Sequence, residues 1–440
     1  MPEQSKTTRR SLIQNSATAT VAAIGAPFII RATALGKAGS VAPSNRIVMG
    51  CIGTGGKGRN NMGTFMNNKD VQVVAVNDVD TGHAAQAKKE VDEKYGNNDC
   101  KTYADFRELI ARDDIDAVSI ATPDHWHALT TIAAANAKKD IYCEKPLSNS
   151  IGEGRAMADA VRKNNVVLQC GSHERSGNNA RYVAELVMNG RLGKVDTVRI
   201  NITCTDGHHK ECKAIKDMPP VADVPEALDY DFWLGHTAKV PYTKRGVHFY
   251  WRFTLAYGGG EMTDRGAHVI DLAQLALGKD DTGPLWIEAK GMQNSNSLYD
   301  AFWDYNFEMT YANGTKLIGS TDEPRGLKFE GERGWIFVHV HGQQLKASDP
   351  AILKEEIGDG EIKVGRSPGH HRNFLDCVKT RQQPVAHVEA GHRTASLCHL
   401  NNIAMRVQRK LRWDPATEQF IDDSEANRWV TPNMRAPWSL

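Results

Sequence analysis

The chain has 440 residues, with 54 lysines and arginines against 53 aspartates and glutamates, and 40% of its residues are hydrophobic. The near-zero net charge excludes the strongly charged surface that would attract nucleic acid or an anionic membrane. The length is too great for one ordinary hydrophobic core and favours two domains of a soluble globular protein.

The first 42 residues are expected to be an export leader that is not part of the folded protein. Residues 8–14 (TRRSLIQ) resemble a twin-arginine signal, and residues 17–30 are apolar and rich in small side chains. This stretch is too short and too weakly apolar to predict a membrane span, whereas a charged start before an apolar segment is typical of an exported leader. We therefore expect a periplasmic protein whose mature chain begins between Leu35 and Asn45. The alternative is a disordered tail with a chance arginine pair.

A glycine-rich turn follows a short apolar run at residues 47–49. Gly53, Gly55 and Gly58 have the G-x-G-x-x-G spacing of a dinucleotide-binding loop, and Gly56 lies within it. The first glycine allows a tight turn, the second lets a pyrophosphate approach the backbone, and the third lets the helix lie close to the strand. The N-terminus of that helix would face the phosphate charge.

An acidic residue ends the next expected strand, residues 71–76. Asp78 stands at roughly the offset at which a carboxylate accepts hydrogen bonds from the adenosine ribose, and it would repel a 2′-phosphate. The series of strand, loop, helix and acid therefore predicts NAD as the cofactor in preference to NADP. A glycine-rich turn with a surface aspartate is the alternative.

Helices and strands go on alternating after Asp78. We expect helices over residues 84–94 and up to Ala137, and strands over residues 117–121 and 140–143. This alternation predicts a doubly wound parallel sheet over residues 43–167, in which ligands bind at the carboxyl ends of the strands. Two polar turns follow such strand ends, residues 122–127 and 144–146, and they should face the same crevice as the glycine loop.

The first of these turns is interpreted as a wall of the nicotinamide site. Pro123, His125 and His127 surround Trp126, and Thr122 begins the turn. We expect these residues to shape the site more than to act as acids or bases. Glu144 and Lys145 of the second turn are expected at the same site.

Three motifs in order resemble the glucose-fructose oxidoreductase / inositol dehydrogenase / MocA (Gfo/Idh/MocA) family. They are Glu144-Lys145-Pro146, the segment from Asp264 through His268 to Asp271, and a late pair at residues 373–378 and 391–399. The resemblance implies an α/β protein with an N-terminal Rossmann domain and a C-terminal α+β domain. It also implies that the E-K-P lysine and the D-x-x-x-H pair meet at the nicotinamide.

The chemistry of these residues can be argued on its own. Oxidation of a sugar carbinol needs a base for the hydroxyl proton, a cation or donor to hold that oxygen, and a nicotinamide to accept hydride. His268 is the candidate base because imidazole titrates near neutral pH. Asp264 shares a helix face with it if the helix begins at or before Asp264, Asp271 continues that face, and Lys145 would hold the reacting oxygen.

Each catalytic assignment has a structural alternative. Asp264 could be a helix N-cap, and His268 could be a partly buried histidine whose hydrogen bonds are satisfied. Lys145 could pair with Glu144 or with a surface acid. Taken jointly, these alternatives are much weaker than the catalytic interpretation.

The second domain is expected to span residues 168–440 and to begin at an apolar run, residues 166–171. Its expected strands cover residues 192–203, 287–292, 305–311, 315–320 and 334–340. Many strands with few intervening helices predict a large, mostly antiparallel open sheet. In the family, such a sheet forms the oligomer contact, so a homodimer or homotetramer is expected; a monomer with a helix-covered sheet is the alternative. Late helices and the last thirty residues are expected to pack back over a domain surface.

Two arginines are candidates for substrate binding together with Lys145, Asp264 and His268. Arg175 follows the end of an expected strand, and Arg252 stands beside aromatic residues shortly before Asp264. Aromatic faces that stack on sugar rings, with arginine donating to hydroxyls, would suit a carbohydrate pocket. The same aromatic residues could equally be ordinary core.

The eight cysteines predict no disulfide framework. Cys204, His208, His209 and Cys212 lie within nine positions, yet their spacing matches no zinc pattern, and we predict no metal. A substrate-side loop or, in an oxidising compartment, a local disulfide is the preferred interpretation.

The sequence thus predicts an exported NAD-dependent oxidoreductase that transfers hydride between a carbinol of a sugar, glycoside or polyol and a tightly bound nicotinamide. Because free NAD is scarce outside the cytoplasm, we hypothesise that the cofactor is recycled within the site. One alternative is an NAD-dependent glycosidase or epimerase that oxidises the sugar transiently, with no net redox change. A second is a non-catalytic sugar-binding protein that retains NAD.

Overall fold

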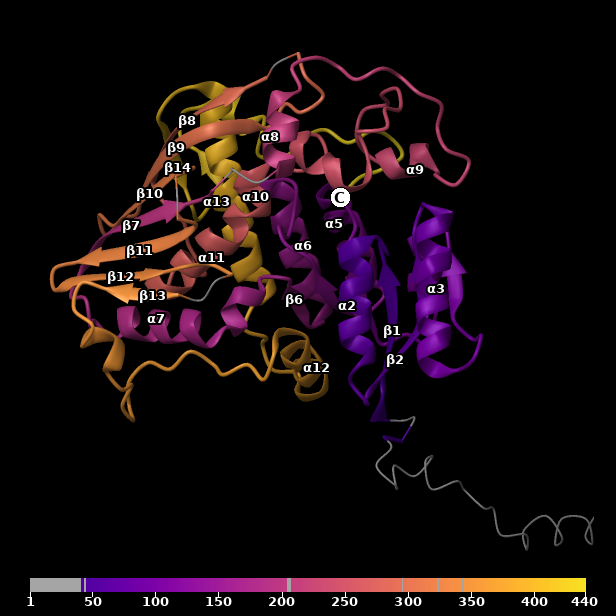
Figure 1. The fold of residues 1–440 in the computed structure, drawn as a ribbon, viewed down its shortest axis with the longest axis horizontal. Helices are drawn as coiled ribbons and strands as arrows, with labels where there is room; N and C mark the ends of the chain where they lie inside the picture. The colour runs from indigo at the N-terminus through magenta and orange to yellow at the C-terminus, as the bar shows by residue number, and fades with distance from the viewer. Residues whose placement is uncertain (1–40, 43–44, 204–206, 295, 323, 342–343) are drawn as a thin grey trace, which may run out of the picture. The chain divides into compact units, whose positions relative to one another are not determined.

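The computed structural model describes residues 41–42, 45–203, 207–294, 296–322, 324–341 and 344–440 (Figure 1). Two compact units are distinguished, Met1–Arg46 and Ile47–Leu440, and the second is described below. The predicted leader, residues 1–42, lies almost wholly outside the described residues. Within the described ranges, no helix has the length and apolar character needed to cross a membrane.

The first part of the second unit is built on a parallel sheet with the strand order β3-β2-β1-β4-β5-β6. Its strands are β1 Ile47–Ile52, β2 Val71–Asn77, β3 Lys101–Tyr103, β4 Ala117–Ile120, β5 Asp140–Cys143 and β6 Leu168–Cys170. The intervening helices are α2 Gly56–Met66, α3 Thr81–Tyr95, α4 Phe106–Ile110, α5 His127–Asn136 and α6 Ile151–Asn164, with a 3-10 turn at Asp124–Trp126. β4 and β5 are buried at every position, as expected for central strands covered by helices on both faces. The predicted doubly wound sheet is confirmed.

The boundary between the two domains lies later than the sequence suggests. β6 pairs with β5 in parallel, with Cys170 opposite Cys143, so it is the sixth strand of the first sheet. The prediction that residues 166–171 open the second domain is therefore wrong. The sequence of a short apolar strand does not show which sheet the strand will join, because strand pairing depends on long-range contacts.

The second sheet has the order β13-β12-β11-β7-β10-β9-β8-β14-β15. Its strands are β7 Val195–Asn201, β8 Trp286–Gln293, β9 Phe302–Thr310, β10 Lys316–Ser320, β11 Gly326–Gly331, β12 Gly334–Val338, β13 Leu345–Ala347, β14 Leu411–Asp414 and β15 Gln419–Phe420. β7 and β10 pair in parallel, whereas the other paired strands of the described sheet are antiparallel. The mostly antiparallel sheet is therefore confirmed, and β11, β13, β14 and β15 were not anticipated.

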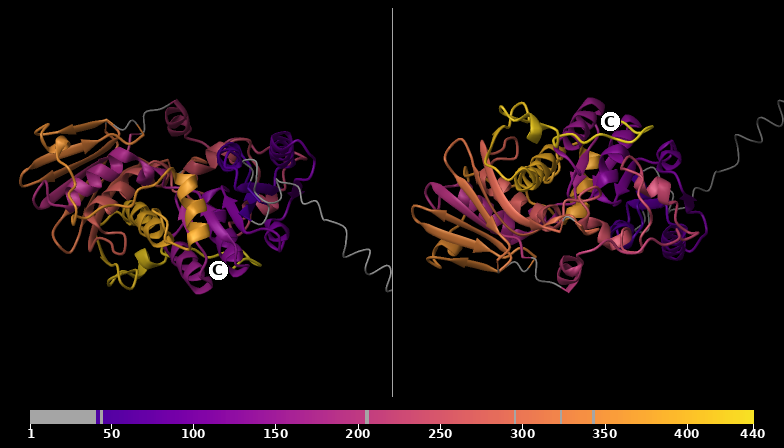
Figure 2. Two further views of the ribbon diagram at one scale, coloured as in Figure 1. Left: turned by 90° about the horizontal axis from the view of Figure 1, so that it is seen from below. Right: turned by 90° about the horizontal axis from the view of Figure 1, so that it is seen from above.

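Helices cover one face of this second sheet (Figures 1 and 2). They are α7 Asn178–Met188, α11 Gly266–Leu277 and α13 Val388–Val407, whose apolar residues share one core with the sheet. Along β7 the burial alternates, with Val198 and Ile200 buried and Asp196 and Arg199 exposed. This alternation is typical of a sheet with one packed face and one open face.

The late helices join the two domains. α12 His370–Thr380 buries Phe374 and Leu375 with Met49 and Phe65 of the first domain. α13 places Val388 and Ala395 in another core of the first domain and Leu397 in the core of the second sheet. Near the carboxyl end, the ring of Trp438 lies 5.0 Å from that of Trp126. These late segments therefore pack over the first domain.

Shorter elements complete the described chain. They are α8 Gly207–Ala214, α9 Tyr230–Leu234, α10 Glu261–Asp264 and α14 Ser424–Asn427, and 3-10 turns at His173–Ser176, His248–Phe253 and Ile352–Lys354.

Candidate active site

The glycine loop adopts the close geometry that the spacing predicts. Gly53 directly follows β1 and has a φ of +77°, and a Cβ there would lie 2.7 Å from the backbone of Ala121 and Thr122. A Cβ on Gly58 would lie 1.9 Å from the carbonyl oxygen of Gly53. A Cβ on Gly56, in contrast, would have no atom within 4 Å. The loop is therefore tight toward the protein and open toward the cavity.

Asp78 stands beside this loop, at the end of β2. Its Oδ2 accepts a hydrogen bond of 2.7 Å from the backbone N–H of Thr54, and His83 Nδ1 lies 3.6 Å from the same oxygen. The hydrogen bond to Asp78 raises the pKa of His83, against the effect of burial. The acid is thus fixed next to the phosphate-binding turn, as a ribose-binding carboxylate requires.

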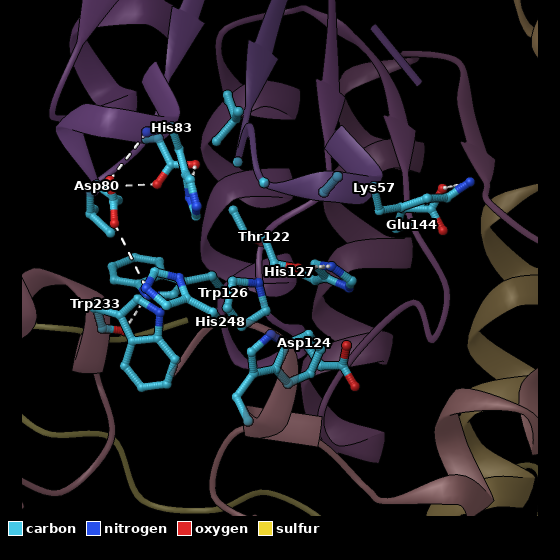
Figure 3. Close-up of a pocket in the computed structure, with 18 of the residues that line it drawn as sticks. Lys57, Asp80, His83, Thr122, Asp124, Trp126, His127, Glu144, Trp233 and His248 are labelled. Atoms are coloured by element: carbon cyan, nitrogen blue, oxygen red, sulfur yellow. Dashed lines mark hydrogen bonds and ion pairs between the residues drawn. The ribbon is translucent and has the colours of Figure 1, made fainter. Parts of the chain in front are cut away.

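One cavity of about 490 Å³ brings most of the predicted site together (Figure 3). Its wall contains Gly53, Gly55, Gly56, Asp78, Thr122, Pro123, His127, Glu144, Lys145, Arg252 and Asp264. These residues come from the carboxyl ends of β1, β2, β4 and β5 and from the second domain. Gly58 lies behind the loop, where it packs on Gly53.

The cavity fits NAD on the evidence of its own residues. The open space at Gly55 and Gly56 adjoins the N-terminus of α2, which suits a pyrophosphate. Asp78 suits the adenosine ribose, and Lys145 and Asp264 lie in the same cavity for a reacting group. The residues that would hold the cofactor are therefore continuous with those that would meet a substrate.

Lys145 and Asp264 form the central contact of this site. Lys145 Nζ donates to Asp264 Oδ1 at 2.5 Å and to its backbone carbonyl at 2.9 Å. Burial alone would lower the pKa of Lys145, but the Asp264 carboxylate outweighs it and raises that pKa. Burial likewise opposes ionisation of Asp264, yet Lys145 and Arg252 hold its pKa well below its usual range. Both groups are therefore charged at neutral pH.

Glu144 is held from the opposite side, so it does not pair with Lys145. Its Oε1 accepts a hydrogen bond of 2.8 Å from Asn61 and lies 3.2 Å from Lys57 Nζ. Both partners belong to α2. Within the E-K-P turn, Glu144 thus binds α2, the helix of the glycine loop, and Lys145 contacts the second domain.

The pKa of His268 differs from the near-neutral value that was expected from the sequence. It lies on α11, directly after α10, and its side chain is only 6% exposed. Burial, followed by the charges of Lys145, His173 and His341, lowers the pKa of His268 well below its ordinary value. The premise that it titrates near neutral pH is wrong for this environment. The imidazole is neutral and borders the cavity residues without being part of the lining described above.

Asp264 is the last residue of α10, and the chain continues through Arg265 into α11. It therefore does not act as the N-cap that was considered as an alternative. Its charge still favours the protonated form of His268 and opposes the effect of burial on that imidazole.

The structure corrects the role predicted for Arg175. Its side chain is 1% exposed, and its guanidinium donates to Asp271 Oδ2 at 2.8 Å and to Asp280 at 2.6 and 2.8 Å. It does not face the cavity, so the prediction that it binds substrate is wrong. Asp271 is likewise committed to Arg175 and, through its other oxygen, to Thr394. The reason is that the buried Asp271, together with the partly exposed Asp280, holds the guanidinium away from the cavity.

His125 is a second correction. The ring is fully buried, its Nε2 lies 2.9 Å from the carbonyl oxygen of Trp233, and it packs on Tyr257. The His125 ring packs against the second domain and does not form part of the cavity wall. His127 does line the cavity, and its two ring nitrogens contact the carbonyl oxygens of Pro146 and Thr122.

Several residues of the site were not singled out from the sequence. Asp124 lines the cavity and is 5% exposed, and burial raises its pKa well above the usual value despite Lys145 and Arg252. Burial thus favours the neutral form of this acid, which can donate a hydrogen bond. Its position in the polar turn after β4 could have revealed it. His173 and His341, which lie beside His268, belong to no motif that a single sequence displays.

The cluster of cysteines and histidines is only partly described. Cys204 lies outside the described residues, so a disulfide with Cys212 stays a prediction. Cys212 is buried, and burial raises the pKa of its thiol to about 12. His209 forms a buried contact with Glu261 of α10.

Comparison with known proteins supports the same division of the chain. The model of an oxidoreductase family with an NAD-binding Rossmann fold (GFO_IDH_MocA) matches residues 47–172, and that of its C-terminal alpha/beta domain (GFO_IDH_MocA_C2) matches residues 176–440. The chain belongs to the Gfo/Idh/MocA oxidoreductase family. Its first domain is thus an NAD-binding Rossmann domain, and the family is one of NAD(P)-binding sugar and polyol oxidoreductases.

Curated members of the Gfo/Idh/MocA family resemble this chain in part. A myo-inositol 2-dehydrogenase of Thermotoga maritima is 37% identical over 26% of this chain and 33% of its own length. A levoglucosan dehydrogenase of Pseudarthrobacter phenanthrenivorans is 26% identical over 55% of this chain and 57% of its own length. The chain therefore matches less than two thirds of the length of these relatives.

Solved structures of the family share the fold. The WlbA dehydrogenase of Bordetella pertussis, in complex with NADH and UDP-GlcNAcA, superposes with a TM-score of 0.61 at 16% identity, covering 84% of this chain and 99% of that one. An aldose-aldose oxidoreductase of Caulobacter crescentus, complexed with glycerol, gives 0.59 at 19% identity, covering 83% and 99%.

Proposed function

We propose that this protein is an NAD-dependent oxidoreductase that moves hydride between a carbinol of a sugar, glycoside or polyol and a tightly bound nicotinamide. The observation that carries the proposal is the contact of 2.5 Å between Lys145 and Asp264, in the cavity that also holds the glycine loop and Asp78. The names of the relatives, which include an inositol dehydrogenase and a levoglucosan dehydrogenase, support a polyhydroxylated substrate.

Lys145 is proposed to hold the reacting oxygen. Because its pKa is raised, the side chain stays an ammonium at neutral pH and can donate to an oxygen on which negative charge develops. Asp264 fixes the direction of that ammonium through the hydrogen bond to Oδ1. Arg252 lies 3.7 Å from the same oxygen and is proposed to bind a further hydroxyl of the substrate.

His268 is proposed to accept the hydroxyl proton. Its imidazole is neutral and therefore has a free acceptor nitrogen. NAD, when bound, supplies the hydride acceptor. Asp124 is proposed to donate a hydrogen bond to the bound substrate or cofactor from its neutral acid.

A redox-neutral reaction is the main alternative. A glycosidase or epimerase would use the same residues to oxidise a hydroxyl, change a neighbouring bond and reduce the sugar again. Release of an aromatic aglycone from a panel of aryl glycosides, followed together with the absorbance of reduced nicotinamide, distinguishes the two. Net nicotinamide reduction without aglycone release supports the dehydrogenase. Aglycone release without accumulated reduced cofactor supports the glycosidase, and an inverted sugar carbon without either change supports the epimerase.

A non-catalytic sugar-binding protein is the second alternative. It predicts that sugars bind and that the bound cofactor never changes its redox state. The charged pair at Lys145 and Asp264 favours catalysis, since a binding protein has no need of a cation aimed at a reacting oxygen.

We also propose export through the twin-arginine route, on the basis of residues 8–14. Replacing Arg9 and Arg10 with lysine should keep the protein in the cytoplasm, and fractionation would reveal it. Unchanged distribution of this variant would contradict the proposal.

A homodimer or homotetramer through the open face of the second sheet likewise stays a prediction, to be checked by light scattering.

A further inference from the structure

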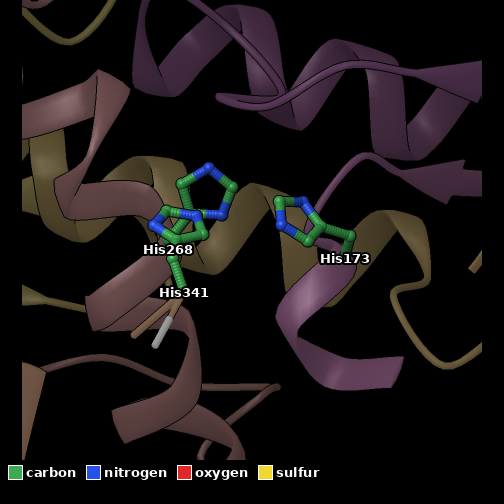
Figure 4. Close-up of side chains that lie close together, drawn as sticks. All are labelled: His173, His268 and His341. Atoms are coloured by element: carbon green, nitrogen blue, oxygen red, sulfur yellow. The ribbon is translucent and has the colours of Figure 1, made fainter. Parts of the chain in front are cut away.

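Three histidines meet at the edge of the proposed catalytic site. His173 follows β6 of the first domain, His268 lies on α11, and His341 follows β12 (Figure 4). Their ring centroids are separated by 4.9 Å for His173 and His268, 4.7 Å for His268 and His341, and 5.5 Å for His173 and His341. One nitrogen of each ring lies within 4.8 Å of those of the other two.

Packing of the rings accounts for only part of this arrangement. His173 and His341 stack, but His268 meets both of them at steep angles of 67° and 74°. Nδ1 of His268 is buried and has no hydrogen-bond partner among the residues that the structure describes. An unpartnered buried nitrogen is costly unless something else satisfies it.

We propose that His173, His268 and His341 bind one divalent transition-metal ion of the zinc type. Neutral imidazole nitrogens are common ligands of such ions. At metal–nitrogen distances of about 2.0–2.1 Å in a tetrahedral arrangement, the ligand nitrogens lie about 3.3–3.4 Å apart. Nitrogens that are up to 4.8 Å apart would therefore need to approach one another by up to about 1.5 Å, which rotations of the three side chains can supply. His268 would gain the partner that its buried nitrogen lacks.

Charged groups of both signs surround this position. Lys145 and Arg325 place positive charge near the rings, and the Arg325 guanidinium is 3.3 Å from His341 Nδ1. Glu174 offsets them, because its buried Oε1 lies 3.5 Å from His173 Nε2 and 3.4 Å from His341 Nε2. A carboxylate next to ligating imidazoles is the usual second layer of a metal site.

The site would keep an open position. The side chains of His173 and His341 are 44% and 34% exposed, so the cluster is buried on the side of His268 and accessible on the other. Three protein ligands with a free position are characteristic of catalytic ions, whereas structural ions have four. We infer that the free position takes a hydroxyl oxygen of the substrate.

This last step rests on the proposed hydride transfer and would replace the role of His268 as proton acceptor, whereas metal binding itself does not depend on the proposed function. A nitrogen of His268 that holds the ion cannot also accept a proton. In the metal-bound protein the ion would lower the pKa of the coordinated hydroxyl, its O–H bond would break, the proton would leave to solvent and the oxygen would stay on the ion.

The experiment is a cobalt titration of protein that was purified without a polyhistidine tag and freed of metal with a chelator. We expect one Co²⁺ per chain, with the visible absorption of a low-coordinate ion. His173→Ala and His341→Ala should each weaken binding at least about tenfold, since loss of a ligand should cost no less than loss of an outer partner. His339→Ala, two residues from His341 but outside the cluster, should bind as the wild type does. Bound NAD and circular dichroism report on folding.

Absence of saturable Co²⁺ binding to the wild type, or unchanged binding by both cluster variants, would overturn the proposal. If the variants do not fold, X-ray absorption of the zinc-loaded wild type decides the matter. Three imidazole nitrogens at about 2.0–2.1 Å support the site, and a shell of oxygen ligands alone refutes it. Neither result depends on whether sugars reduce the bound cofactor, so failure of the metal site and failure of the proposed function are separately visible.

Discussion

Lys145 of the first domain donates a hydrogen bond of 2.5 Å to Asp264 of the second, across 119 positions of the sequence. The contact joins the carboxyl end of β5 in the Rossmann domain to the helix pair α10 and α11, which carries His268. A charged pair therefore links the first domain to the second within the cavity at which we propose that the reaction takes place.

Replacing Lys145 with alanine should abolish most turnover while NAD stays bound. The variant loses the ammonium that holds the reacting oxygen, and a general acid–base or charge-stabilising group contributes roughly 10²- to 10⁴-fold. Turnover and bound NAD would be measured on the same preparation. Lys163→Ala, an exposed lysine on α6, is the matched control. Unchanged turnover of Lys145→Ala would favour the non-catalytic alternative.

Two glycines of the same loop should respond differently to alanine. Gly58→Ala places a Cβ 1.9 Å from the carbonyl oxygen of Gly53 and should lower the free energy of unfolding by about 1–3 kcal/mol. Gly56→Ala meets no protein atom within 4 Å and should leave folding intact but weaken NAD binding, because its methyl enters the space for phosphate. Thermal unfolding and NAD titration measure the two effects.

Gly63→Ala is the control for both, since it lies on the same helix and its methyl also meets nothing within 4 Å. It should change neither stability beyond the ordinary preference of helices for alanine nor NAD affinity. Equal NAD affinity for Gly56→Ala and Gly63→Ala would show that the phosphate does not bind at Gly56.

Arg175 should prove structural. Arg175→Ala leaves Asp271 and Asp280 without their buried cation, and removal of one partner from such a cluster costs about 3–5 kcal/mol. Chemical denaturation measures that loss. Arg199→Ala, whose side chain is 53% exposed and paired with Glu330, should cost less than about 1 kcal/mol. A stable Arg175→Ala protein with a raised KM would instead restore the substrate role.

Asp70 should make the attachment of α12 depend on pH. Burial would raise its pKa, but Arg372 and Lys379 of α12 lower it to about 2. Because the pKa is lower in the folded state, the stabilisation is fully present above about pH 4 and is lost as the pH falls toward 2. Asp70→Asn should therefore cost about 2 kcal/mol at neutral pH, and the difference from the wild type should shrink with acid.

Denaturation curves at several pH values measure this difference. Asp114→Asn serves as the control, because that carboxylate is 58% exposed beside Arg112 and should contribute little at any pH. A cost for Asp70→Asn that stays constant down to pH 2 would show that charge is not the cause.

The strands and helices of the first domain were predicted from the sequence more completely than those of the second, for physical reasons. The glycine loop and Asp78 are local features, and alternating strands and helices with apolar runs leave few possible topologies. β11 begins and ends with glycine, and β13 and β15 are very short, so neither pattern nor propensity marks them. β6 was placed in the wrong domain because only its long-range pairing with β5 reveals its sheet.

The candidate site could be predicted only in part, for the same reason. Lys145, Asp264 and Arg252 reach the cavity as expected, since each lies at a strand end or a loop that the motifs mark. The burial of Arg175 depends on Asp280, which stands 105 positions away in no motif. The low pKa of His268 depends first on its burial in the tertiary structure, and then on Lys145 and on two other histidines from separate elements. Contacts of this kind arise from the tertiary structure and leave no signature in a single sequence.

The most direct measurement is on protein purified without added nucleotide. Bound NAD(H) is released by denaturation and counted, and on the native protein the absorbance of the reduced nicotinamide is followed as sugars, glycosides and polyols are added. We expect about one NAD per chain and reduction of the bound cofactor by at least one polyhydroxylated compound. A protein that neither retains, binds nor reduces NAD would contradict the account.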